Sequence, residues 1–236
     1  MTTSYGAAFY ADRRQATRHA ADRLLSVVAE HVPFRRVADV GCGTGTWLAA
    51  AIDLGAETAF GYEGEWVAGL PLDDARIALT QVDLEQSLIG EQVDLVISLE
   101  VAEHLSPGRA DGFVGDLCAM GPAILFSAAI PGQGGVNHVN EQWQSYWAEK
   151  FAAQGYRAFD VVRPRLWSDN AIPAWYRQNA ILYLHDSLAP GSTLTAVEDR
   201  GALDLVHPVL WNRANRELEY AAALPESEYL RALPRG

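Results

Sequence analysis

The stretch Val37-Ala38-Asp39-Val40-Gly41-Cys42-Gly43-Thr44-Gly45-Thr46-Trp47 decides the fold of this chain. It opens as a short valine-rich run that is typical of a buried strand. Three glycines follow with one residue between each pair, and an apolar helical pattern begins at Trp47. A strand, a glycine turn and a helix in this order form a nucleotide pocket at the carboxyl edge of an open α/β sheet. Glycines suit such a turn because they let the backbone approach a ligand where a Cβ atom would clash.

The spacing of the glycines distinguishes two kinds of nucleotide pocket. The dinucleotide fingerprint GxGxxG places its third glycine where this chain has Thr46. Here the pattern is GxGxG, with Asp39 two residues before Gly41. The spacing disfavours an NAD-dependent oxidoreductase. For this segment alone, a strand–helix turn that binds no ligand is the remaining alternative.

The composition indicates an acidic globular protein. The chain has 236 residues, 49% hydrophobic and 20% charged, with a net charge of −12 at pH 7. This charge disfavours nucleic acids and membrane surfaces as partners, and no apolar run is long enough to cross a bilayer. The N-terminus lacks the pattern of a signal peptide, and the two cysteines, Cys42 and Cys118, form no disulfide framework and have no metal spacing. We therefore expect a cytoplasmic protein.

Strand and helix patterns alternate along most of the chain, which predicts an α/β fold with a mostly parallel sheet and helices on both faces. The expected strands are residues 37–40, 58–62, 77–82, 93–98, 123–128, 156–162 and 180–184, the last two as an antiparallel edge pair. The expected helices are residues 12–31, 107–119, 140–154 (with Asn140 as cap) and 208–233. We expect one domain, in which residues 1–32 form a helical lid, 33–186 the core sheet with its helices, and 187–236 a helical extension.

Three of the predicted strands end in acidic residues, which are Glu63, Asp83 and Glu100. The carboxyl ends of parallel strands share the edge of the sheet where ligands bind. Glu63 follows Gly45 by 18 residues, a spacing at which a carboxylate accepts hydrogen bonds from the hydroxyls of a ribose. Asp83 and the apolar Leu84 are expected beside an adenine ring. The alternative for each acid is a solvated loop carboxylate.

Longer segments carry a resemblance to a known family. They are Ser98-Leu99-Glu100-Val101-Ala102-Glu103-His104-Leu105, Phe126-Ser127-Ala128-Ala129-Ile130-Pro131-Gly132-Gln133-Gly134-Gly135, Asn137-His138-Val139-Asn140-Glu141-Gln142-Trp143, Arg163-Pro164-Arg165-Leu166-Trp167 and Trp175-Tyr176-Arg177-Gln178-Asn179. With the glycine turn, they make nearly the full chain similar to class I S-adenosylmethionine (SAM) methyltransferases, above all to small bacterial enzymes of that group. The resemblance implies a three-layer, seven-stranded Rossmann-like sheet with an antiparallel final hairpin, and SAM as cofactor. It also implies methyl transfer to an oxygen or nitrogen of a small-molecule acceptor, in secondary metabolism or sugar modification. In the family an aspartate is commoner at the position of Glu63, and glutamate keeps the ribose role.

The residues expected to bind SAM come from the turn, the strand ends and the N-terminal helix. They are Asp39, Gly41, Cys42, Gly43, Gly45, Glu63, Asp83, Leu84, Glu100, Tyr10 and Arg18. Asp39 would either orient the turn through backbone N–H groups or hold the ammonium group of SAM through water. Tyr10 and Arg18 belong to the helix that would close over SAM as a lid.

His104 and His138 are the candidate catalytic residues. An alcohol, phenol or ammonium acceptor must lose a proton, and a base with a near-neutral pKa assists that step. His104 follows the strand expected at 93–98, and His138 lies in a glycine-bounded loop after the strand expected at 123–128. A loop or capping hydrogen bond is the structural alternative for each histidine.

Glu100, Glu103 and His104 form an ExxEH motif, which places all three side chains on one face if the segment is helical. Together with His138 they make two carboxylates and two imidazoles, a set able to hold a divalent ion such as Mg²⁺ that would lower the pKa of an acceptor oxygen. The set resembles the metal ligands of small-RNA 3′-end 2′-O-methyltransferases and of ubiquinone-pathway O-methyltransferases. The alternative assigns Glu100 to the SAM pocket, Glu103 to a helix cap and His104 to packing.

An aromatic and polar loop at residues 163–179, together with the helix after Asn140, is expected to form the wall of the acceptor site. The candidates that would contact the acceptor are Trp143, Tyr146, Arg165, Trp167 and Trp175. An ordinary core beneath a loop is the alternative.

Two other functions stay open. One is a non-catalytic module that binds SAM. The other is a metal-dependent RNA 2′-O-methyltransferase, which the ExxEH resemblance suggests and the net acidity disfavours. The sequence also leaves the acceptor and the oligomeric state open, a homodimer included.

Overall fold

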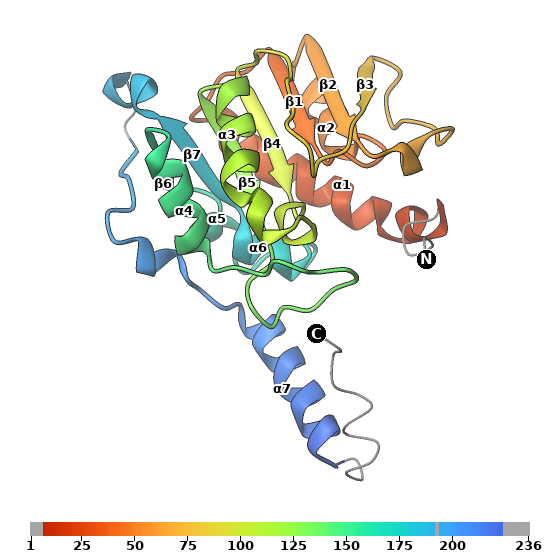
Figure 1. Ribbon diagram of the computed structural model, residues 1–236, viewed down its shortest axis with the longest axis vertical. Helices are drawn as coiled ribbons and strands as arrows, with labels where there is room; N and C mark the ends of the chain where they lie inside the picture. Colours follow the sequence, from red (N-terminus) through yellow and green to blue (C-terminus); the bar gives the residue numbers. More distant parts are fainter. Residues whose placement is uncertain (1–6, 192–193, 224–236) are drawn as a thin grey trace.

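The computed structural model describes the backbone of residues 7–191 and 194–223, and the side chains of residues 15–188 and 194–216. Within this part of the chain, seven strands form one sheet in the order β3-β2-β1-β4-β5-β7-β6 (Figure 1). Neighbouring strands are parallel, except that β7 is antiparallel to both β5 and β6. The predicted fold class and the antiparallel final hairpin are therefore confirmed. The strands are β1 Arg36–Val40, β2 Thr58–Glu63, β3 Ile77–Gln81, β4 Leu95–Leu99, β5 Ala123–Ser127, β6 Tyr156–Phe159 and β7 Ile181–His185.

Helices cover both faces of the sheet. Side chains of α1, α2 and α6 pack in a core on one face, and side chains of α3 and α4 pack in a core on the other. All five residues of β4 are buried, as expected of a central parallel strand that is covered on both sides. The helices are α1 Ala7–Ala29, α2 Thr46–Asp53, α3 Ala110–Met120, α4 Gln144–Ala153, α5 Arg163–Leu166, α6 Ala174–Asn179 and α7 Pro208–Ala223, with 3₁₀ turns η1 Glu65–Val67, η2 Ala102–His104, η3 Pro107–Arg109, η4 Asp186–Gly191 and η5 Arg200–Leu203. None of the helices in the described ranges has the length and apolar character needed to cross a membrane.

Three predicted segments differ from the structure. The helix expected from Asn140 begins only at Gln144. The residues before it form an extended connection whose N–H groups donate to other segments, Asn140 to the carbonyl of Glu103 at 3.0 Å and Gln142 to that of Ala129 at 3.1 Å. The segment 163–179, expected as a loop, contains α5 and α6, since both helices bury one side in the core. The last predicted helix is described as far as the end of α7, and residues 224–233 lie outside the described part.

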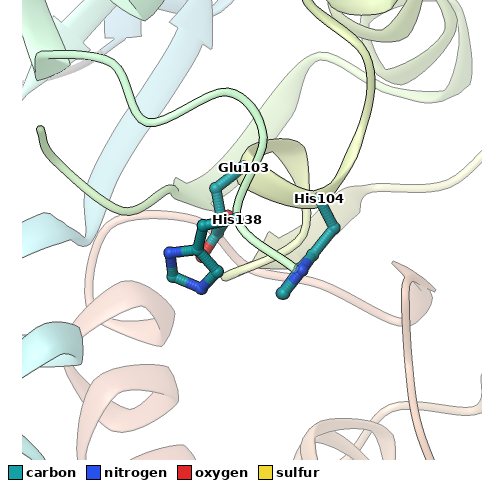
Figure 2. A group of neighbouring side chains, drawn as sticks. All are labelled: Glu103, His104 and His138. Carbon is teal, nitrogen blue, oxygen red and sulfur yellow. The ribbon is translucent and has the colours of Figure 1, made fainter. Parts of the chain in front are cut away.

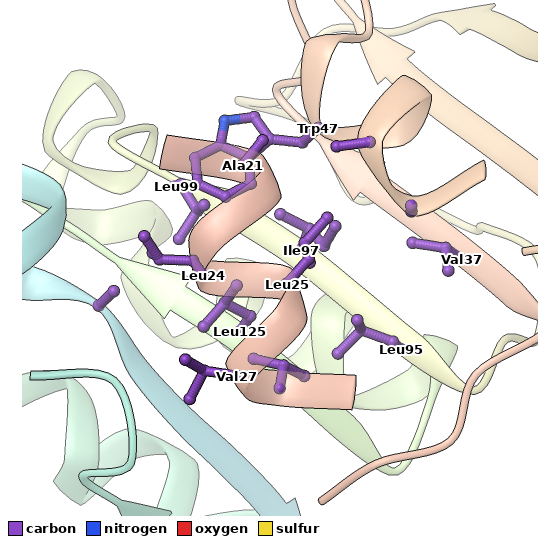
Figure 3. Close-up of a cluster of buried hydrophobic side chains, with 14 of the residues drawn as sticks. Ala21, Leu24, Leu25, Val27, Val37, Trp47, Leu95, Ile97, Leu99 and Leu125 are labelled. Atoms are coloured by element: carbon purple, nitrogen blue, oxygen red, sulfur yellow. The ribbon is translucent and has the colours of Figure 1, made fainter. Parts of the chain in front are cut away.

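The second half of α1 belongs to the core. Leu24 and Leu25 are fully buried and belong to the same core cluster as Leu95 and Ile97 of β4, with α1 running along the sheet (Figure 3). A segment with this burial cannot move without opening the core. The lid role predicted for residues 1–32 is therefore restricted to the beginning of α1, where the side chains up to residue 14 lie outside the described part.

The strand order reverses between β1 and β4. The chain passes from β1 toward β2 and β3 on one side of the sheet, and from β4 toward β5 on the other. In open α/β sheets, the crevice at the carboxyl ends of two such strands is where ligands bind. The glycine turn follows β1 and Glu100 follows β4, so the fold brings both to this crevice.

Replacing Leu24 by alanine is expected to lower the free energy of unfolding by about 2–5 kcal/mol, because the change leaves a cavity under the sheet. Leu54→Ala, at a position that is 43% exposed, is the control and should change this free energy by less than about 0.5 kcal/mol. Urea unfolding followed by circular dichroism measures both values. Small and equal effects would show that α1 is not part of the core.

Candidate functional site

A cavity of about 530 Å³ lies at the carboxyl ends of β1 and β4. The glycine turn, the residues after β4, the loop after β5, and α6 form most of its wall, and Thr17 of α1 and Arg213 of α7 complete it. Nine of the residues predicted from the sequence line this cavity: Asp39, Gly41, Cys42, Gly43, Glu100, Glu103, His104, His138 and Trp175.

The glycine turn requires glycine at two positions. Gly41 and Gly45 have φ values of 84° and 87°, which residues with a Cβ atom rarely adopt. A Cβ atom at Gly41 would lie 2.3 Å from Cγ2 of Val101, and one at Gly45 would lie 2.5 Å from Cδ1 of Ile77. The turn thus packs directly against neighbouring side chains. Gly45 does so outside the cavity lining, and its contact with the ligand stays a prediction.

Glu63 holds the glycine turn in place. Its Oε2 accepts a hydrogen bond from the backbone N–H of Gly43 at 2.8 Å. Its Oε1 accepts from the N–H of Gly64 at 2.7 Å and from the indole N–H of Trp66 at 3.1 Å. Burial raises the pKa of Glu63 even though these three donors lower it. The sequence predicted a ribose ligand here but not the contact with Gly43, and the ribose role stays a prediction.

Asp39 is a buried carboxylate with an unsatisfied oxygen. The side chain is 2% exposed, and its Oδ2 has no hydrogen-bond partner among the described residues. Burial, and next the nearby charge of Glu63, raise the pKa of Asp39 well above its usual range. Of the two roles predicted for Asp39, orientation of the turn is taken by Glu63. The unsatisfied oxygen favours the other role, which is binding a cationic group.

Thr46 takes part in a contact that the sequence did not reveal. Its hydroxyl donates to Oδ2 of Asp73 at 2.6 Å, and the hydroxyl of Thr44 donates to Oδ1 of Asp73 at 3.3 Å. These hydrogen bonds join the loop before β3 to the glycine turn. They also place the carboxylate of Asp73 next to the turn. Only the tertiary structure brings Asp73 here, since no motif marks it.

Glu100 connects β4 with the loop after β5 and with α6. It follows β4 with a φ of 58°, a strained conformation for a residue with a side chain. Its Oε2 accepts from the amide of Gln133 at 3.0 Å and its Oε1 from the amide of Asn179 at 3.1 Å. The positive φ interrupts any helix between Glu100 and His104, so the expected single helical face of the ExxEH motif is wrong. Gln133 and Asn179 were not predicted as site residues.

Glu103, His104 and His138 form a compact cluster beside the cavity (Figure 2). One potential ligand atom from each residue lies within 4.8 Å of those of the other two, and the two imidazole rings are 4.8 Å apart and nearly perpendicular. Burial and the neighbouring Glu100 raise the pKa of Glu103 well above its usual range. Burial and then His138 lower the pKa of His104. The cluster contains three of the four predicted metal ligands and omits Glu100, whose oxygens accept from the amides of Gln133 and Asn179.

Several residues predicted to bind SAM lie away from the cavity lining. Asp83 is exposed and accepts from the N–H of Glu85 at 3.0 Å, while Leu84 packs against the core on the α3 side. The guanidinium of Arg18 is engaged by the carboxylates of Asp22 and Asp53, and its contact with SAM stays a prediction. The side chain of Tyr10 lies outside the described residues.

The predicted acceptor wall needs a larger correction. Of its five candidates, Trp175 lines the cavity, and the other four lie elsewhere. Trp143 is 38% exposed just before α4, and Tyr146 packs on Trp147 and under Lys150. Neither side chain reaches the cavity, because α4 is oriented about its axis so that Trp147 points into the core. Arg165 pairs with Glu30, and Trp167 contacts His207.

The loop after β5 supplies the wall instead. Four of its residues line the cavity, together with Tyr176 and Arg213. They are Gln133, Gly134, Gly135 and Val136. The guanidinium of Arg213 donates to the carbonyl of Gln133. The signal that could have identified this loop is its position directly after a parallel strand, at the ligand edge of the sheet.

Known structures share this fold at low sequence identity. No family model matches the chain, and no curated protein matches it. Magnesium protoporphyrin IX methyltransferase from Synechocystis PCC 6803, with bound S-adenosylhomocysteine (SAH), is similar with a TM-score of 0.51 and 15% identity, over 78% of this chain and 90% of that chain. An O-methyltransferase family protein from Burkholderia thailandensis gives a TM-score of 0.54 and 14% identity, over 75% of this chain and 58% of that chain.

Human N-acetylserotonin methyltransferase in complex with SAM has a TM-score of 0.51 and 16% identity, over 75% of this chain and 52% of that chain. The chain thus spans little more than half the length of the human and Burkholderia proteins, and most of the length of the Synechocystis protein. These likenesses establish the fold.

Gly41→Ala is expected to destabilise the protein more than Gly69→Ala. Both glycines have a similar φ, 84° and 81°, but a Cβ at Gly69 would meet nothing within 4 Å. In the control Gly69→Ala, only backbone strain should lower the free energy of unfolding, by about 1–2 kcal/mol. In Gly41→Ala, the clash with Val101 should lower the free energy of unfolding by a further amount of about 1–3 kcal/mol. Urea unfolding measures both free energies, and equal losses would contradict the close packing of the turn.

Proposed function

We propose that this chain, which has the fold of SAM-dependent methyltransferases, transfers the methyl group of SAM to an oxygen or nitrogen atom of a small-molecule acceptor. The cavity between β1 and β4 would hold SAM. The observation that carries the proposal is the unsatisfied carboxylate oxygen of Asp39, which is buried in the same cavity as the glycine turn. A cationic nucleoside supplies the partner that this oxygen lacks.

The charges around the cavity support a cationic ligand. Asp39, Glu100 and Glu103 line it, whereas Arg213 is the one arginine or lysine among the described lining residues. SAM carries a sulfonium and an ammonium group, both of which nearby carboxylates attract. A cation beside Asp39 would also favour its charged form, which burial disfavours. The phosphates of a dinucleotide would not, and Asp73 beside the turn would repel them. This difference supports SAM over NAD.

The sequence predictions give SAM an orientation in the cavity. Asp39 would pair with its ammonium group, and Glu63 would accept hydrogen bonds from the ribose. Glu63 has capacity for this, because each carboxylate oxygen offers about two acceptor sites and its Oε2 accepts from Gly43 alone among the described residues. Asp83 and Leu84 would bound the adenine at the end of β3.

The chemistry needs position more than acid or base strength. SAM supplies a methyl group that is already activated on its sulfonium. A lone pair of the acceptor forms the new bond to the methyl carbon, and the electrons of the broken C–S bond return to sulfur to give neutral SAH. The proton of a hydroxyl or ammonium acceptor passes to solvent. The contribution expected of the protein is an aligned pair of reactants in a site without water. The rings of Trp47 and Tyr176, which meet edge to face at 5.2 Å, provide such a dry wall.

A small organic acceptor agrees with the lining and with the comparisons. Trp47, Trp175 and Tyr176 offer flat apolar surfaces of the kind that bind organic ligands. The names of two similar structures specify a magnesium porphyrin and N-acetylserotonin as the molecules methylated. Secondary metabolism or sugar modification, implied by the sequence resemblance, is our proposal for the pathway.

Calorimetric titration tests the ligand. We expect SAM and SAH to bind with one molecule per chain and NADH to give no heat. Incubation with methyl-labelled SAM and a panel of phenols, alcohols and amines then tests for transfer. The proposed function fails if neither SAM nor SAH gives heat. Binding without transfer to any acceptor would favour the non-catalytic alternative, and transfer to RNA would favour the RNA methyltransferase.

Binding of SAM is expected to release a proton from Asp39. The carboxyl pKa is raised by burial and by Glu63 in the ligand-free protein, and an ammonium group beside it would lower the pKa again. Calorimetry in two buffers with different ionisation enthalpies measures the released proton. Asp39→Asn should abolish this release and weaken binding about 10- to 100-fold.

Asp111→Asn is the matched control for that experiment. Its side chain is 85% exposed and pairs with Lys150 on the surface, so proton release and affinity should equal those of the original chain. A proton release that persists in Asp39→Asn would contradict the role of Asp39.

A further inference from the structure

We propose that Glu103, His104 and His138 bind a divalent transition-metal ion, and that this ion holds the oxygen atom of a hydroxyl-bearing acceptor. The ion site follows from the arrangement of these three side chains (Figure 2). The part of the proposal that concerns the acceptor rests on the proposed methyl transfer.

Glu103 is the first reason for the proposal. Its side chain is 0% exposed, and neither carboxylate oxygen makes a hydrogen bond of good geometry among the described residues, although the backbone at Glu103 and Ala129 lies close enough to lower the pKa of the carboxyl. Burying a carboxylate without a partner is costly, and buried charges are normally paired or bound to a metal. The carboxylate belongs to a cluster with two imidazoles that also lines the cavity. A cation between these groups would supply the partner that the protein lacks.

The two histidines are oriented as metal ligands are. Nδ1 of His104 lies 3.2 Å from the carbonyl oxygen of Asn137, and Nδ1 of His138 lies 2.8 Å from Oε1 of Glu141. A carbonyl oxygen only accepts, so Nδ1 of His104 is the donor to Asn137 and Nε2 is its ligand nitrogen. In the same arrangement at His138, Nδ1 faces Oε1 of Glu141, and Nε2 is the nitrogen that would bind a metal. A metal-bound histidine typically donates its other N–H to a carbonyl or a carboxylate in this way.

The loop that carries His138 is fixed against Glu103. The N–H groups of Val139 and Asn140 donate to the carbonyl of Glu103 at 2.9 and 3.0 Å. A Cβ atom at Gly135 would lie 2.2 Å from Nε2 of His138, so only glycine permits this ring position.

Two further features define the conformation of this loop, the carboxylate of Glu141 and the positive φ of Asn137. Glu141 accepts from the N–H groups of Gly132 and Gly134, each at 2.8 Å. Asn137 has a φ of 58° and in this strained conformation presents its carbonyl to His104. The surrounding contacts thus hold the cluster together without an ion.

The ligand types indicate which ions fit. Two imidazole nitrogens and one carboxylate oxygen suit Mn²⁺, Fe²⁺, Co²⁺, Ni²⁺ or Zn²⁺, whereas Mg²⁺ prefers oxygen ligands and water. This favours a different ion from the Mg²⁺ expected from the sequence. Neighbouring ligands of such an ion lie about 3.0–3.4 Å apart, at bonds of about 2.1 Å in octahedral or tetrahedral geometry. The three atoms, now within 4.8 Å of one another, would therefore have to move closer by up to about 1–2 Å.

A metal in this position would select a hydroxyl acceptor. Three protein ligands leave coordination positions toward the cavity, where an acceptor oxygen can bind. Coordination lowers the pKa of a bound O–H group, so its proton passes to solvent and the oxygen keeps the electron pair. That pair forms the O–CH₃ bond, and the C–S electrons return to the sulfur of SAM. His104 and His138 then act as ligands and not as the bases expected from the sequence.

Cobalt binding tests the site on the full chain. The protein is first treated with a chelator, then titrated with Co²⁺ while its visible absorption and heat of binding are followed. We expect one equivalent to bind. Glu103→Gln and His138→Asn should weaken binding at least about tenfold, and Glu141→Gln about 10- to 100-fold by releasing the His138 ring. His185→Asn, on β7 and bonded to Ser187, should leave the affinity unchanged.

Absence of saturable Co²⁺ binding would overturn the proposal, as would binding that survives both Glu103→Gln and His138→Asn. Thermal unfolding adds a readout that does not depend on enzyme activity. Co²⁺ should raise the melting temperature of the original chain and not that of Glu103→Gln. Without metal, Glu103→Gln should be about as stable as the original chain, because glutamine keeps the size of the side chain and burial already disfavours the charged form of Glu103. A lower stability would indicate a structural role instead.

A parallel titration with SAH separates this proposal from the proposed function. Heat from SAH without Co²⁺ binding would overturn the metal site alone. Co²⁺ binding without heat from SAH would overturn the methyl transfer and leave the metal site standing.

Discussion

The structure depends on the close contact between the glycine turn after β1 and two aliphatic side chains, Val101 and Ile77. The turn occupies space in which a Cβ atom does not fit, and Glu63 anchors it from the end of β2. Val101 lies between Glu100 and η2, so its packing against Gly41 also fixes the path of the chain after β4. The contact between Gly41 and Val101 therefore sets the relative positions of the glycine turn and the segment after β4. These two segments supply most of the polar groups in the cavity.

The sheet could be predicted because its signals are local. Each strand is a short apolar run of its own, and the glycine spacing describes a turn whose conformation is decided within five residues. The positions of Glu63, at the end of β2, and of Glu100, after β4, could be predicted for a related reason. The parallel topology alone brings the ends of these strands to one edge of the sheet. The cluster of Glu103, His104 and His138 was anticipated from residue types. Its geometry was not, because the positive φ of Glu100 breaks the expected helix.

The acceptor wall could not be predicted, because aromatic side chains serve cores as readily as pockets. Whether Tyr146 or Trp147 faces the core depends on the rotation of α4 about its axis, and composition carries no information on that rotation. Arg165 illustrates the same limit, since its partner Glu30 is distant in sequence. The residues that were missed, such as Gln133 and Asn179, are ordinary polar residues that meet only in the folded chain.

The position of β7 has a consequence for how the protein is made. Among the described strands, β6 pairs with β7 alone, and β7 lies between β5 and β6 although it follows both in the chain. During synthesis on the ribosome, the hydrogen-bonding edge of β5 must wait unpaired until β7 emerges. An unpaired edge of this kind recruits strands from other nascent chains. The yield of folded protein should consequently respond to chaperone supply and growth temperature during this interval.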